Sequence, residues 1–423
     1  MKKWPAIVMA ASGLLVAACS PGGGGVGSAL TTTTTPPPPP AKAAIAPAAG
    51  GQNVATDSPI TVTASGGTIT DVEITGGGKV SGSLSPDKKT WTSTGTLNVS
   101  ATYTVNATVV NSAGKSSTAT SSFTTLTPTS VEHTHIFEAE NTAYGVGMPI
   151  MLTFDKPVAN KAAVEQALSL TTSQPVVGAW AWADDTHVDF RPRDYWPANT
   201  TVSFAGHLNG VQVSPGVYGA ADLTQTFSIG DSIVVVAGAA SHHMQVYKNG
   251  ALQYDWPIST GKPGHDTPNG TYLTIEKGNP VEMKPADIAP GGPGYYDLKV
   301  PWSVRFTWSG DYLHDAYWSV GDQGNSDVSH GCVNMPPEAA QAYYEEELPG
   351  DPVTINGSPL AGTRGDGWTD WFDSWQDLLG KSATHMALQA GPSGSTFVAP
   401  ASVAASAATA PTWMPAANNA AAA

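Results

Sequence analysis

The chain has 423 residues, a formal net charge of −15 at pH 7 and only 13% charged residues, against 45 glycines and 34 prolines. This length accommodates about two to four domains. The acidic balance, with no Lys/Arg cluster after the first residues, argues against nucleic acid and anionic membrane surfaces as partners of the folded part. Few charges with much glycine and proline are typical of β-rich exported domains joined by flexible segments.

Residues 1–18 have the pattern of an export signal peptide. Two lysines precede an apolar stretch, Trp4–Ala18, that is too short for a comfortable membrane span. The segment from Leu15 to Cys19 resembles the lipobox of bacterial lipoproteins, which implies cleavage before Cys19 and acylation of its thiol. Ordinary cleavage nearby, with Cys19 lost or left free, is the alternative. Acyl chains on Cys19 would anchor the protein to the outer face of the cell membrane.

Both ends of the mature chain are predicted to be disordered. Residues 19–52 contain a glycine run, Thr31–Thr35 and Pro36–Pro40, which together are typical of an extended tether. Residues 388–423 are rich in alanine, proline and serine, and we predict a disordered tail there.

Two β-sandwich domains are predicted between the tether and residue 230. Residues 53–127 and 128–230 both carry short runs of alternating apolar residues separated by turn residues. In the second domain we predict a helical insert near residues 162–168, and Trp180 and Trp182 as core residues of one strand face. His133 and His135 are spaced like a metal pair, but no third ligand lies nearby at a suitable spacing, so we predict no metal site.

Residues 231–357 form a third β-rich unit, and residues 358–387 form a Trp-rich extension. In the third unit, Asn249-Gly250 predicts a hairpin turn. In the extension, Trp368, Trp371 and Trp375 share one face of a predicted amphipathic helix over residues 367–381. Acidic residues occupy the polar face, which favours docking onto the third unit over membrane binding.

The chemistry of the chain is concentrated around Cys332. If Cys19 is acylated, Cys332 is the one remaining thiol, so no internal disulfide forms. A lone thiol in an oxidising compartment is a liability unless it has a use, although a buried inert cysteine is the alternative. His314 lies 18 residues before Cys332, with Gly321 and Gly324 between them, so we expect the two side chains on adjacent strands or loop ends. An imidazole beside a thiol indicates a cysteine nucleophile.

Several segments together resemble an L,D-transpeptidase catalytic domain. They are Ser259-Thr260-Gly261, Thr267-Pro268-Asn269-Gly270-Thr271-Tyr272, His314, Trp318-Ser319-Val320-Gly321 and Ser329-His330-Gly331-Cys332-Val333-Asn334. With the lipobox and the two predicted sandwiches, the chain resembles the mycobacterial and actinobacterial lipoprotein branch of that family. The resemblance implies a mainly all-β fold: two immunoglobulin-like β-sandwich domains, then a catalytic β-sandwich domain and a short Trp-rich C-terminal helix.

The resemblance also implies a reaction. In that family the cysteine attacks the third residue of a peptidoglycan tetrapeptide stem, D-alanine leaves, and a side-chain amine of a second stem takes the acyl group in a 3→3 cross-link. By resemblance, Cys332 is the nucleophile, His314 is the base, and the backbone carbonyl of Asp315 steadies the imidazole. Relatives carry serine at that position, and the Asp315 carboxylate could raise the pKa of His314. No metal or organic cofactor is implied, and carbapenems are expected inhibitors.

Further site residues follow from the same resemblance. The backbone N–H groups of Gly331 and Cys332 are expected to hold the oxyanion, and Tyr296 to contact the substrate and the oxyanion. Trp318 is expected to wall the pocket, with a plain core aromatic as the alternative. The expected substrate-binding residues are Tyr296, Ser309, Gly310, Trp318, Ser329, His330 and Asn334.

Other functions stay open at this point. The same acyl-enzyme discharged by water gives an L,D-carboxypeptidase, and discharged by a protein amine it attaches protein to peptidoglycan. A non-catalytic cell-wall-binding lipoprotein is the alternative from another class. Papain-like peptidases place the cysteine before the histidine, and sortases carry an arginine soon after the thiol, whereas the first arginine after Cys332 is Arg364.

Overall fold

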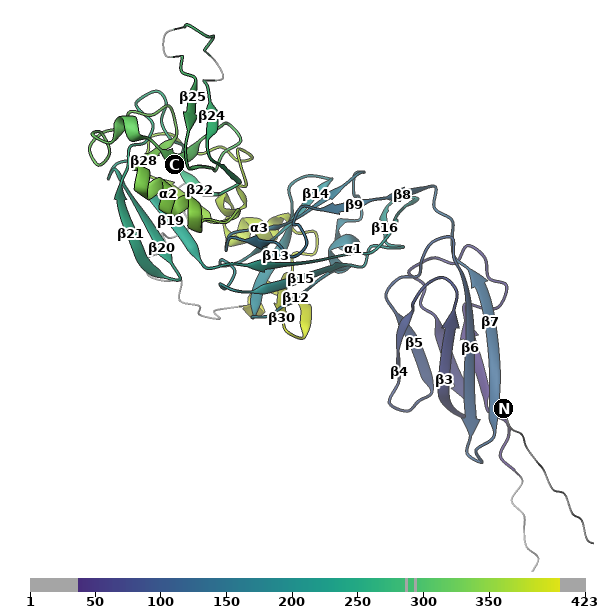
Figure 1. The fold of residues 1–423 in the computed structure, drawn as a ribbon. Helices are drawn as coiled ribbons and strands as arrows, with labels where there is room; N and C mark the ends of the chain where they lie inside the picture. The colour runs from purple at the N-terminus through teal and green to yellow at the C-terminus, as the bar shows by residue number, and fades with distance from the viewer. Residues whose placement is uncertain (1–36, 286–287, 293–294, 404–423) are drawn as a thin grey trace, which may run out of the picture. The chain divides into compact units, whose positions relative to one another are not determined.

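Alternation of apolar and polar residues produces most strands of this chain, because successive side chains of a strand point to opposite faces. The computed structural model describes residues 37–285, 288–292 and 295–403, and Figure 1 shows their ribbon. The predicted signal peptide, Cys19, most of the predicted tether and residues 404–423 of the predicted tail lie outside the described residues. No helix among the described residues is long and apolar enough to cross a membrane.

The first β unit consists of two sheets, in the orders β1-β2-β5-β4 and β3-β6-β7. Its strands are β1 (Lys42–Ala46), β2 (Thr61–Ser65), β3 (Gly67–Thr75), β4 (Ser81–Leu84), β5 (Thr90–Thr94), β6 (Thr102–Asn111) and β7 (Ser116–Thr124). Every second residue of β6 is buried, and Tyr103 of β6 stacks on Phe123 of β7 at 5.6 Å between ring centroids. The prediction of disorder over residues 19–52 is wrong for β1, which pairs antiparallel with β2 along its whole length.

The second β unit also packs two sheets on each other. One sheet has the order β10-β18-β15-β12, and the other β31-β30-β13-β14-β11-β9. A small sheet, β16-β17-β8, lies beside them. The elements are β8 (Ser130–Glu132), β9 (Thr134–Ile136), β10 (Ala143–Tyr144), β11 (Ile150–Phe154), α1 (Lys161–Gln166), β12 (Leu168–Thr172), β13 (Val176–Trp182), β14 (His187–Pro192), β15 (Thr201–Gly206), β16 (Gln212–Ser214), β17 (Val217–Gly219) and β18 (Leu223–Ile229).

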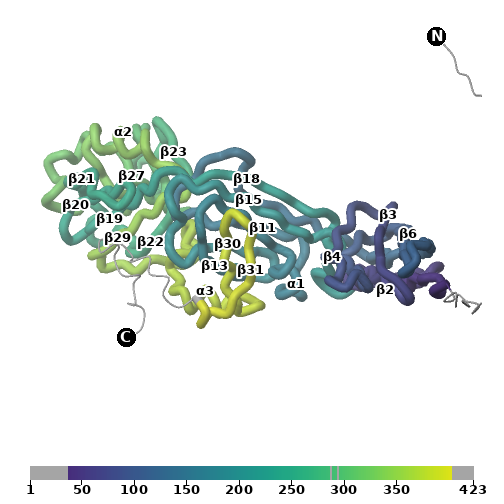
Figure 2. Tube along the Cα trace, turned by 90° about the horizontal axis from the view of Figure 1, so that it is seen from below, coloured from purple at the N-terminus to yellow at the C-terminus, as the bar shows by residue number. Residues whose placement is uncertain are grey.

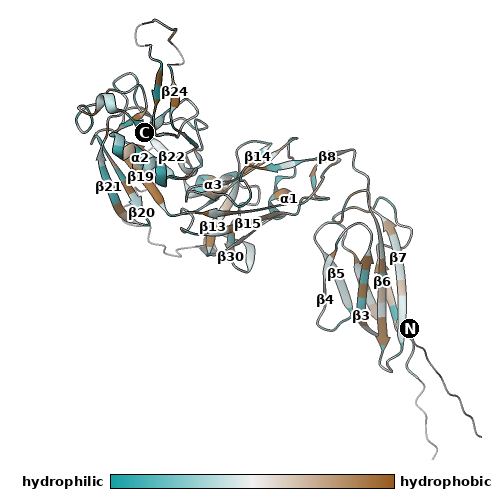
Figure 3. Ribbon diagram, viewed as in Figure 1, coloured by the Kyte–Doolittle hydropathy of each residue, from teal (hydrophilic) through white to brown (hydrophobic). Residues whose placement is uncertain are grey.

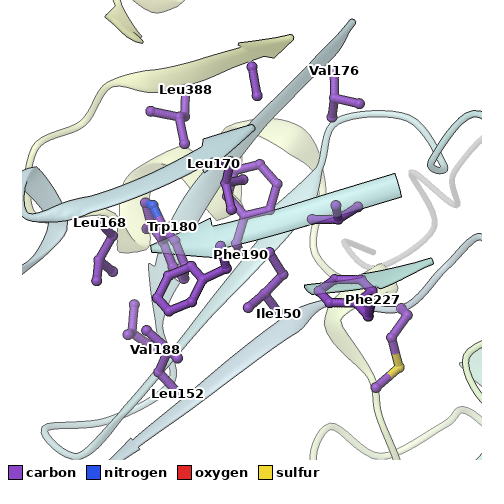
Figure 4. Close-up of a cluster of buried hydrophobic side chains, with 14 of the residues drawn as sticks. Ile150, Leu152, Leu168, Leu170, Val176, Trp180, Val188, Phe190, Phe227 and Leu388 are labelled. Carbon is purple, nitrogen blue, oxygen red and sulfur yellow. The ribbon is translucent and has the colours of Figure 1, made fainter. Parts of the chain in front are cut away.

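The core of this unit lies between its two main sheets, and Figure 4 shows Trp180 and Phe190 among the aliphatic side chains. Their ring centroids are 5.3 Å apart. Trp180 and Trp182 are both buried, as their strand spacing predicts, and α1 forms where the helical insert is predicted.

The end of the described chain returns to this second unit. β30 (Ala387–Gly391) pairs antiparallel with β13, and β31 (Gly394–Val398) pairs with β30. Figure 2 shows this yellow segment beside β13. A short turn of helix, η3 (Pro400–Val403), follows. The prediction of a disordered tail from residue 388 is therefore wrong for residues 388–403, because the edge of β13 supplies hydrogen bonds that the segment's composition does not reveal.

The Trp-rich extension is not one helix. It contains a 3₁₀ turn, η2 (Asp370–Phe372), and a short helix, α3 (Trp375–Lys381). Ser374 caps α3, because its Oγ accepts from the Asp377 N–H at 3.2 Å while the Asp377 carboxylate accepts from the Ser374 N–H. Leu378 and Leu379 of α3 pack with alanines of β13, so the helix docks onto the second unit. The prediction that it docks onto the third unit is wrong.

The third unit carries a five-stranded sheet, β21-β20-β19-β29-β22, and a four-stranded sheet, β23-β26-β27-β28. Its elements are β19 (Ile233–Gly238), β20 (His243–Lys248), β21 (Ala251–Pro257), β22 (Gly270–Leu273), β23 (Glu276–Gly278), β24 (Val281–Met283), β25 (Leu298–Val300), β26 (Ser303–Arg305), β27 (Tyr312–Asp315), η1 (Tyr317–Ser319), β28 (Val333–Met335), α2 (Pro337–Glu346) and β29 (Pro352–Asn356). β20 and β21 form the predicted hairpin around Asn249-Gly250.

A separate apolar core holds the third unit together. It includes Val235 of β19, Val304 of β26 and Tyr343 of α2. Figure 3 shows the brown, hydrophobic colouring of β19, whose residues are nearly all buried. The observed fold is mainly all-β with few short helices, which confirms the predicted fold class.

Candidate active site

A cavity of about 320 Å³ opens in the third unit next to β27 and β28. The β24–β25 hairpin contributes part of its wall. The cavity contains both residues that the sequence identifies as chemically important, His314 and Cys332. Its lining residues are Met283, Tyr296, Leu298, Val300, His314, Trp318, Ser319, Asp322, Val328, Ser329, His330, Cys332 and Asn334.

The parallel pairing of β27 and β28 brings His314 and Cys332 together. His314 is opposite Asn334 in the register, and Cys332 lies two residues before Asn334, immediately ahead of β28. Side chains two positions apart on a strand share a face, as do directly paired residues on neighbouring strands. The imidazole, the thiol and the Asn334 amide therefore face the same cavity.

A backbone carbonyl fixes the imidazole of His314. Nδ1 lies 2.8 Å from the carbonyl oxygen of Asp315. A carbonyl oxygen only accepts hydrogen bonds, so Nδ1 carries the proton and Nε2 keeps a lone pair for accepting another. Burial lowers the pKa of His314 to about 4, and the Asp315 carbonyl offsets part of this effect.

The carboxylate of Asp315 does not raise the pKa of His314, contrary to the sequence expectation. Burial raises the pKa of Asp315 itself, and one of its carboxyl oxygens has no hydrogen-bond partner. Burial of the ring and the hydrogen bond from Nδ1 to the Asp315 carbonyl are what act on the pKa of His314; the Asp315 carboxyl does not add to them. Burial of the ring therefore dominates, and the imidazole is neutral at neutral pH.

Cys332 is a neutral thiol in the resting site. Its Sγ donates a long hydrogen bond of 3.9 Å to the carbonyl oxygen of Gly310. Burial and then the carboxyl of Asp311 raise the pKa of the thiol to about 12, although the backbone N–H of Tyr312 opposes this shift. A neutral thiol beside a neutral imidazole becomes reactive when the base takes its proton as a substrate binds.

Two segments of the third unit, around Thr260 and Thr267, hold the turn that carries Cys332. The Ser329 N–H donates to the Thr260 carbonyl at 3.0 Å, and the Thr267 hydroxyl donates to the Gly331 carbonyl at 2.6 Å. The Ser329 hydroxyl donates to the Cys332 carbonyl at 2.6 Å. The segments around Thr260 and Thr267 therefore act as supports for the nucleophile's turn.

The backbone conformation of this turn favours glycine at position 331, and the N–H of Gly331 already has an acceptor within the turn. Its φ of +130° favours glycine, and its N–H donates to Ser329 Oγ at 3.2 Å. That N–H is already engaged, so the expectation that it is a free oxyanion donor does not match the resting geometry. The N–H of Cys332 faces its own sulfur.

The other expected substrate-binding residues divide into two groups. Tyr296, Trp318, Ser329, His330 and Asn334 line the cavity, and Trp318 is 44% exposed, so it is a wall residue and not a core aromatic. Ser309, Gly310, Gly331 and Asp315 do not line it.

Ser309 and Gly310 nevertheless belong to the surroundings of the thiol. Ser309 bonds Asp366 of the extension through its N–H and hydroxyl, at 2.7 and 2.6 Å. Gly310 supplies the carbonyl that faces Sγ.

Sequence reasoning missed several lining residues. Ser319 accepts a hydrogen bond of 3.0 Å from the Asn334 amide, which orients that amide in the cavity. Met283 and Leu298 come from the β24–β25 hairpin, which carries no motif. Ser319 belongs to the segment Trp318-Ser319-Val320-Gly321, which contributes to the family resemblance, so the sequence could have indicated it as a site residue. Among the described residues, no group of three or more His, Cys, Asp or Glu side chains could hold a metal ion.

Comparison with known proteins gives a consistent result. Residues 51–212 match the bacterial Ig domain family, and residues 231–355 match the L,D-transpeptidase catalytic domain. L,D-transpeptidase 5 of Mycobacterium tuberculosis is 35% identical over 349 residues, covering 80% of this chain and 76% of that protein. L,D-transpeptidase 2 of the same species is 32% identical over 337 residues, covering 77% of this chain and 82% of that protein.

A solved structure of an LD transpeptidase in complex with imipenem is 34% identical and covers 52% of this chain and 97% of that chain, with a TM-score of 0.45. The two Mycobacterium tuberculosis relatives are each covered over more than two thirds of their length at over 30% identity. With an immunoglobulin-like region followed by this catalytic domain, the chain belongs to the L,D-transpeptidase family.

Proposed function

We propose that this protein is a peptidoglycan L,D-transpeptidase that forms 3→3 cross-links through an acyl-enzyme on Cys332. The donor is a tetrapeptide stem, and the acceptor is the side-chain amine of a second stem. The observation that carries the proposal is the placement of His314 on β27 and of Cys332 immediately ahead of the parallel strand β28, in one cavity, with the imidazole fixed by the Asp315 carbonyl. Membership of the family supports the same reaction class.

The proposed first step is acylation. Nε2 of His314 takes the thiol proton, and Sγ of Cys332 attacks the carbonyl carbon of the third stem residue. The tetrahedral intermediate collapses to a thioester when the bond to D-alanine breaks, and the imidazolium returns its proton to the leaving amine. The Cys332 N–H and the Tyr296 hydroxyl are the proposed oxyanion donors.

The proposed second step is transfer to the acceptor. The neutral imidazole takes a proton from the incoming amine, which attacks the thioester carbonyl and releases Cys332. Trp318, His330 and Asn334 line the cavity and are the proposed contacts to the two stems. Because the Asn334 amide nitrogen donates to the Ser319 hydroxyl, the orientation of this side chain in the cavity wall is fixed.

Two further parts of the proposal concern location and inhibition. Residues 1–18 direct export, and a lipid on Cys19 holds the protein at the outer face of the cell membrane, where it acts in the periplasm and cell wall; the lipobox pattern supports this. A carbapenem acylates Cys332, since its strained β-lactam carbonyl is open to the same attack.

The test uses the chain without residues 1–19, a synthetic tetrapeptide stem and a carbapenem, with intact-mass and product analysis. Wild type is expected to release D-alanine, to give a stem dimer and to form a one-to-one carbapenem adduct. Cys332→Ala should form no adduct and no dimer, and His314→Ala should acylate at least about 100-fold more slowly. His243→Ala is the matched control, because His243 is an exposed histidine of the same unit that bonds Asp255.

The products separate the alternatives. A shortened stem without dimer would replace cross-linking by L,D-carboxypeptidase activity on the same acyl-enzyme. An acyl-enzyme that passes only to the amine of a protein would favour protein attachment to peptidoglycan. Absence of both adduct and D-alanine release from folded wild type would overturn the enzymatic proposal and favour a non-catalytic wall-binding protein.

A further inference from the structure

A carboxyl group lies beside the nucleophile and has no part in the proposed mechanism. Asp311 is half-buried and immediately precedes β27. Its Oδ2 accepts a hydrogen bond of 3.1 Å from the Thr307 hydroxyl. A Cβ atom placed on Gly331 would lie only 2.3 Å from Asp311 Oδ1. The carboxyl therefore occupies the space that a side chain at position 331 would fill, directly next to Cys332.

The loop that carries Asp311 is held in one conformation. Thr307 Oγ1 accepts from the N–H groups of Gly310 and Asp311, at 3.2 and 2.7 Å. The carbonyl of Gly310 is the group that faces Sγ of Cys332. The same loop thus fixes both the carboxyl and the carbonyl against the nucleophile, so the carboxyl cannot turn away when the thiol ionises.

The groups around Asp311 do not neutralise it. Asp366 of the extension brings a second carboxylate, bonded to Ser309. The guanidinium of Arg305 donates to the carbonyls of Thr307 and Trp308 and pairs with Glu276 at 2.9 Å. Within residues 37–285, 288–292 and 295–403, Asp311 forms no ion pair. The Asp311 carboxyl also acts on the pKa of Tyr272 and of Cys332, and Tyr312 follows it directly in the chain.

We propose that Asp311 is a positioning residue that opposes ionisation of Cys332, so that the thiol is activated most readily while the Asp311 carboxyl is protonated. When His314 takes the proton of Cys332, a negative charge forms on Sγ. With Asp311 ionised, this charge forms beside an existing anion in a poorly solvated site, where like charges repel strongly. With Asp311 protonated, the repulsion is absent.

The electrostatics of the site agree with this geometry. Burial, with a smaller contribution from Asp366, raises the pKa of Asp311 to about 6. Asp311 in turn adds to the rise in the pKa of Cys332. His314 must be neutral to act, and its pKa is about 4. The thiol is therefore easiest to activate between about pH 4, the pKa of His314, and about pH 6, the pKa of Asp311. At higher pH the ionised Asp311 keeps the resting thiol protonated and less open to oxidation.

The test measures thiol reactivity without any peptidoglycan chemistry. Iodoacetamide alkylation of Cys332 is followed by intact mass from pH 4.5 to 9.5 in wild type, Asp311→Asn and Asp255→Asn. Asparagine keeps the size of the side chain and an acceptor for Thr307, while it removes the charge. We expect Asp311→Asn to be alkylated at least about tenfold faster at pH 7.5, since lowering the thiol pKa by one unit raises the thiolate fraction tenfold. Asp255, an exposed carboxylate of β21, is the matched control and should match wild type.

A second variant separates the effect of the lost charge from an effect of altered packing at position 311. Asp311→Ser removes the charge with a smaller side chain and should also be alkylated faster than wild type, and thermal unfolding establishes that each variant is folded. Alkylation that is unchanged or slower in both folded variants would overturn the proposal. The inference rests on the proposed function only in taking Cys332 as the nucleophile, and the alkylation test does not depend on that function. A wild type that fails to react with carbapenem would refute the transpeptidase mechanism and leave the alkylation result intact.

Discussion

Nδ1 of His314 lies 2.8 Å from the carbonyl oxygen of Asp315, the residue that follows it in β27. The bond is made by the backbone, so it fixes the tautomer of the imidazole whatever side chain stands at position 315. The Asp315 side chain is buried, and this burial raises its own pKa, while the pKa of His314 responds only to burial of the ring and to the Asp315 carbonyl.

The state of His314 predicts how the acylation rate falls at low pH, which is the acid limb of the pH–rate profile. The pKa of His314 is lowered to about 4, and only the neutral imidazole can take the thiol proton. Acylation by carbapenem should therefore persist at pH 5 and fall as the pH drops through about 4. Asp315→Asn should leave this limb in place, because the carbonyl is kept. An acid limb at pH 6.5 or above in the wild-type rate profile would contradict the neutral, buried imidazole.

Gly331→Ala should abolish most acylation while the rest of the protein stays folded. The new Cβ would meet Asp311 Oδ1 at 2.3 Å, and the φ of +130° is unfavourable for alanine. The turn must shift, and it carries Cys332 with it, so we expect acylation to fall at least about 100-fold. Carbapenem adduct formation measures the loss of acylation, and thermal unfolding establishes that the variant is folded. Gly321→Ala is the control, since its Cβ would meet nothing within 4 Å; similar losses in both variants would argue against this account.

The C-terminal segment should stabilise the second unit through Glu165 of α1. The Glu165 carboxylate is fully buried and accepts from the Trp182 indole at 2.9 Å, the Ser382 hydroxyl at 2.8 Å and the Ala383 N–H at 2.6 Å. Glu165→Ala leaves these donors without an acceptor, and we expect a loss of about 3–5 kcal/mol in the free energy of unfolding. Urea denaturation measures it.

The control for Glu165 is its neighbour on α1, Lys161, which lies near the surface and bonds the exposed Asp185. Lys161→Ala should cost at most about 1 kcal/mol. Removal of residues 382–423 should cost at least as much as Glu165→Ala, since it also removes the β30–β13 pairing. Equal stability of the truncated chain and the wild type would show that this segment does not stabilise the unit.

Stability should fall with rising pH because of Glu138. Burial raises the pKa of Glu138 to about 8, well above its ordinary value, so the folded chain holds a proton there that the unfolded chain releases near pH 4.5. The contribution of Glu138 to stability is therefore complete below about pH 4.5 and is lost as the pH rises through 8. Glu138→Gln should flatten this dependence and raise the melting temperature at pH 8.

The melting temperatures of wild type, Glu138→Gln and Glu140→Gln, measured from pH 5 to 9, check this. Glu140 is exposed and accepts from the Thr226 N–H at 2.9 Å, so its variant should follow the wild-type curve. A Glu138→Gln curve that parallels wild type over this range would show that Glu138 is not protonated in the folded chain.

The C-terminal region illustrates what local patterns miss. The spacing of Trp368, Trp371 and Trp375 predicts one helix, but Ser374 and Asp377 form a capping box that starts a new helix at Trp375. That signal was present in the sequence. Trp371 leaves the helical pattern because Arg191 of β14 stacks on it at 4.3 Å and its indole donates to the Gly147 carbonyl. Those partners lie far away in the sequence, so no local pattern reveals them.

Alternating apolar residues and frequent turns were sufficient to predict the β-rich class, and residue type and order were sufficient to identify His314 and Cys332. The family resemblance also indicated the Asp315 carbonyl. Three features could be seen only in the folded chain: β30 extends the sheet of the second unit, Asp311 lies against Gly331, and burial keeps His314 and Cys332 neutral. Strand pairing, close contact and desolvation depend on groups that are distant along the chain, and their energies are fixed only when the fold brings those groups together.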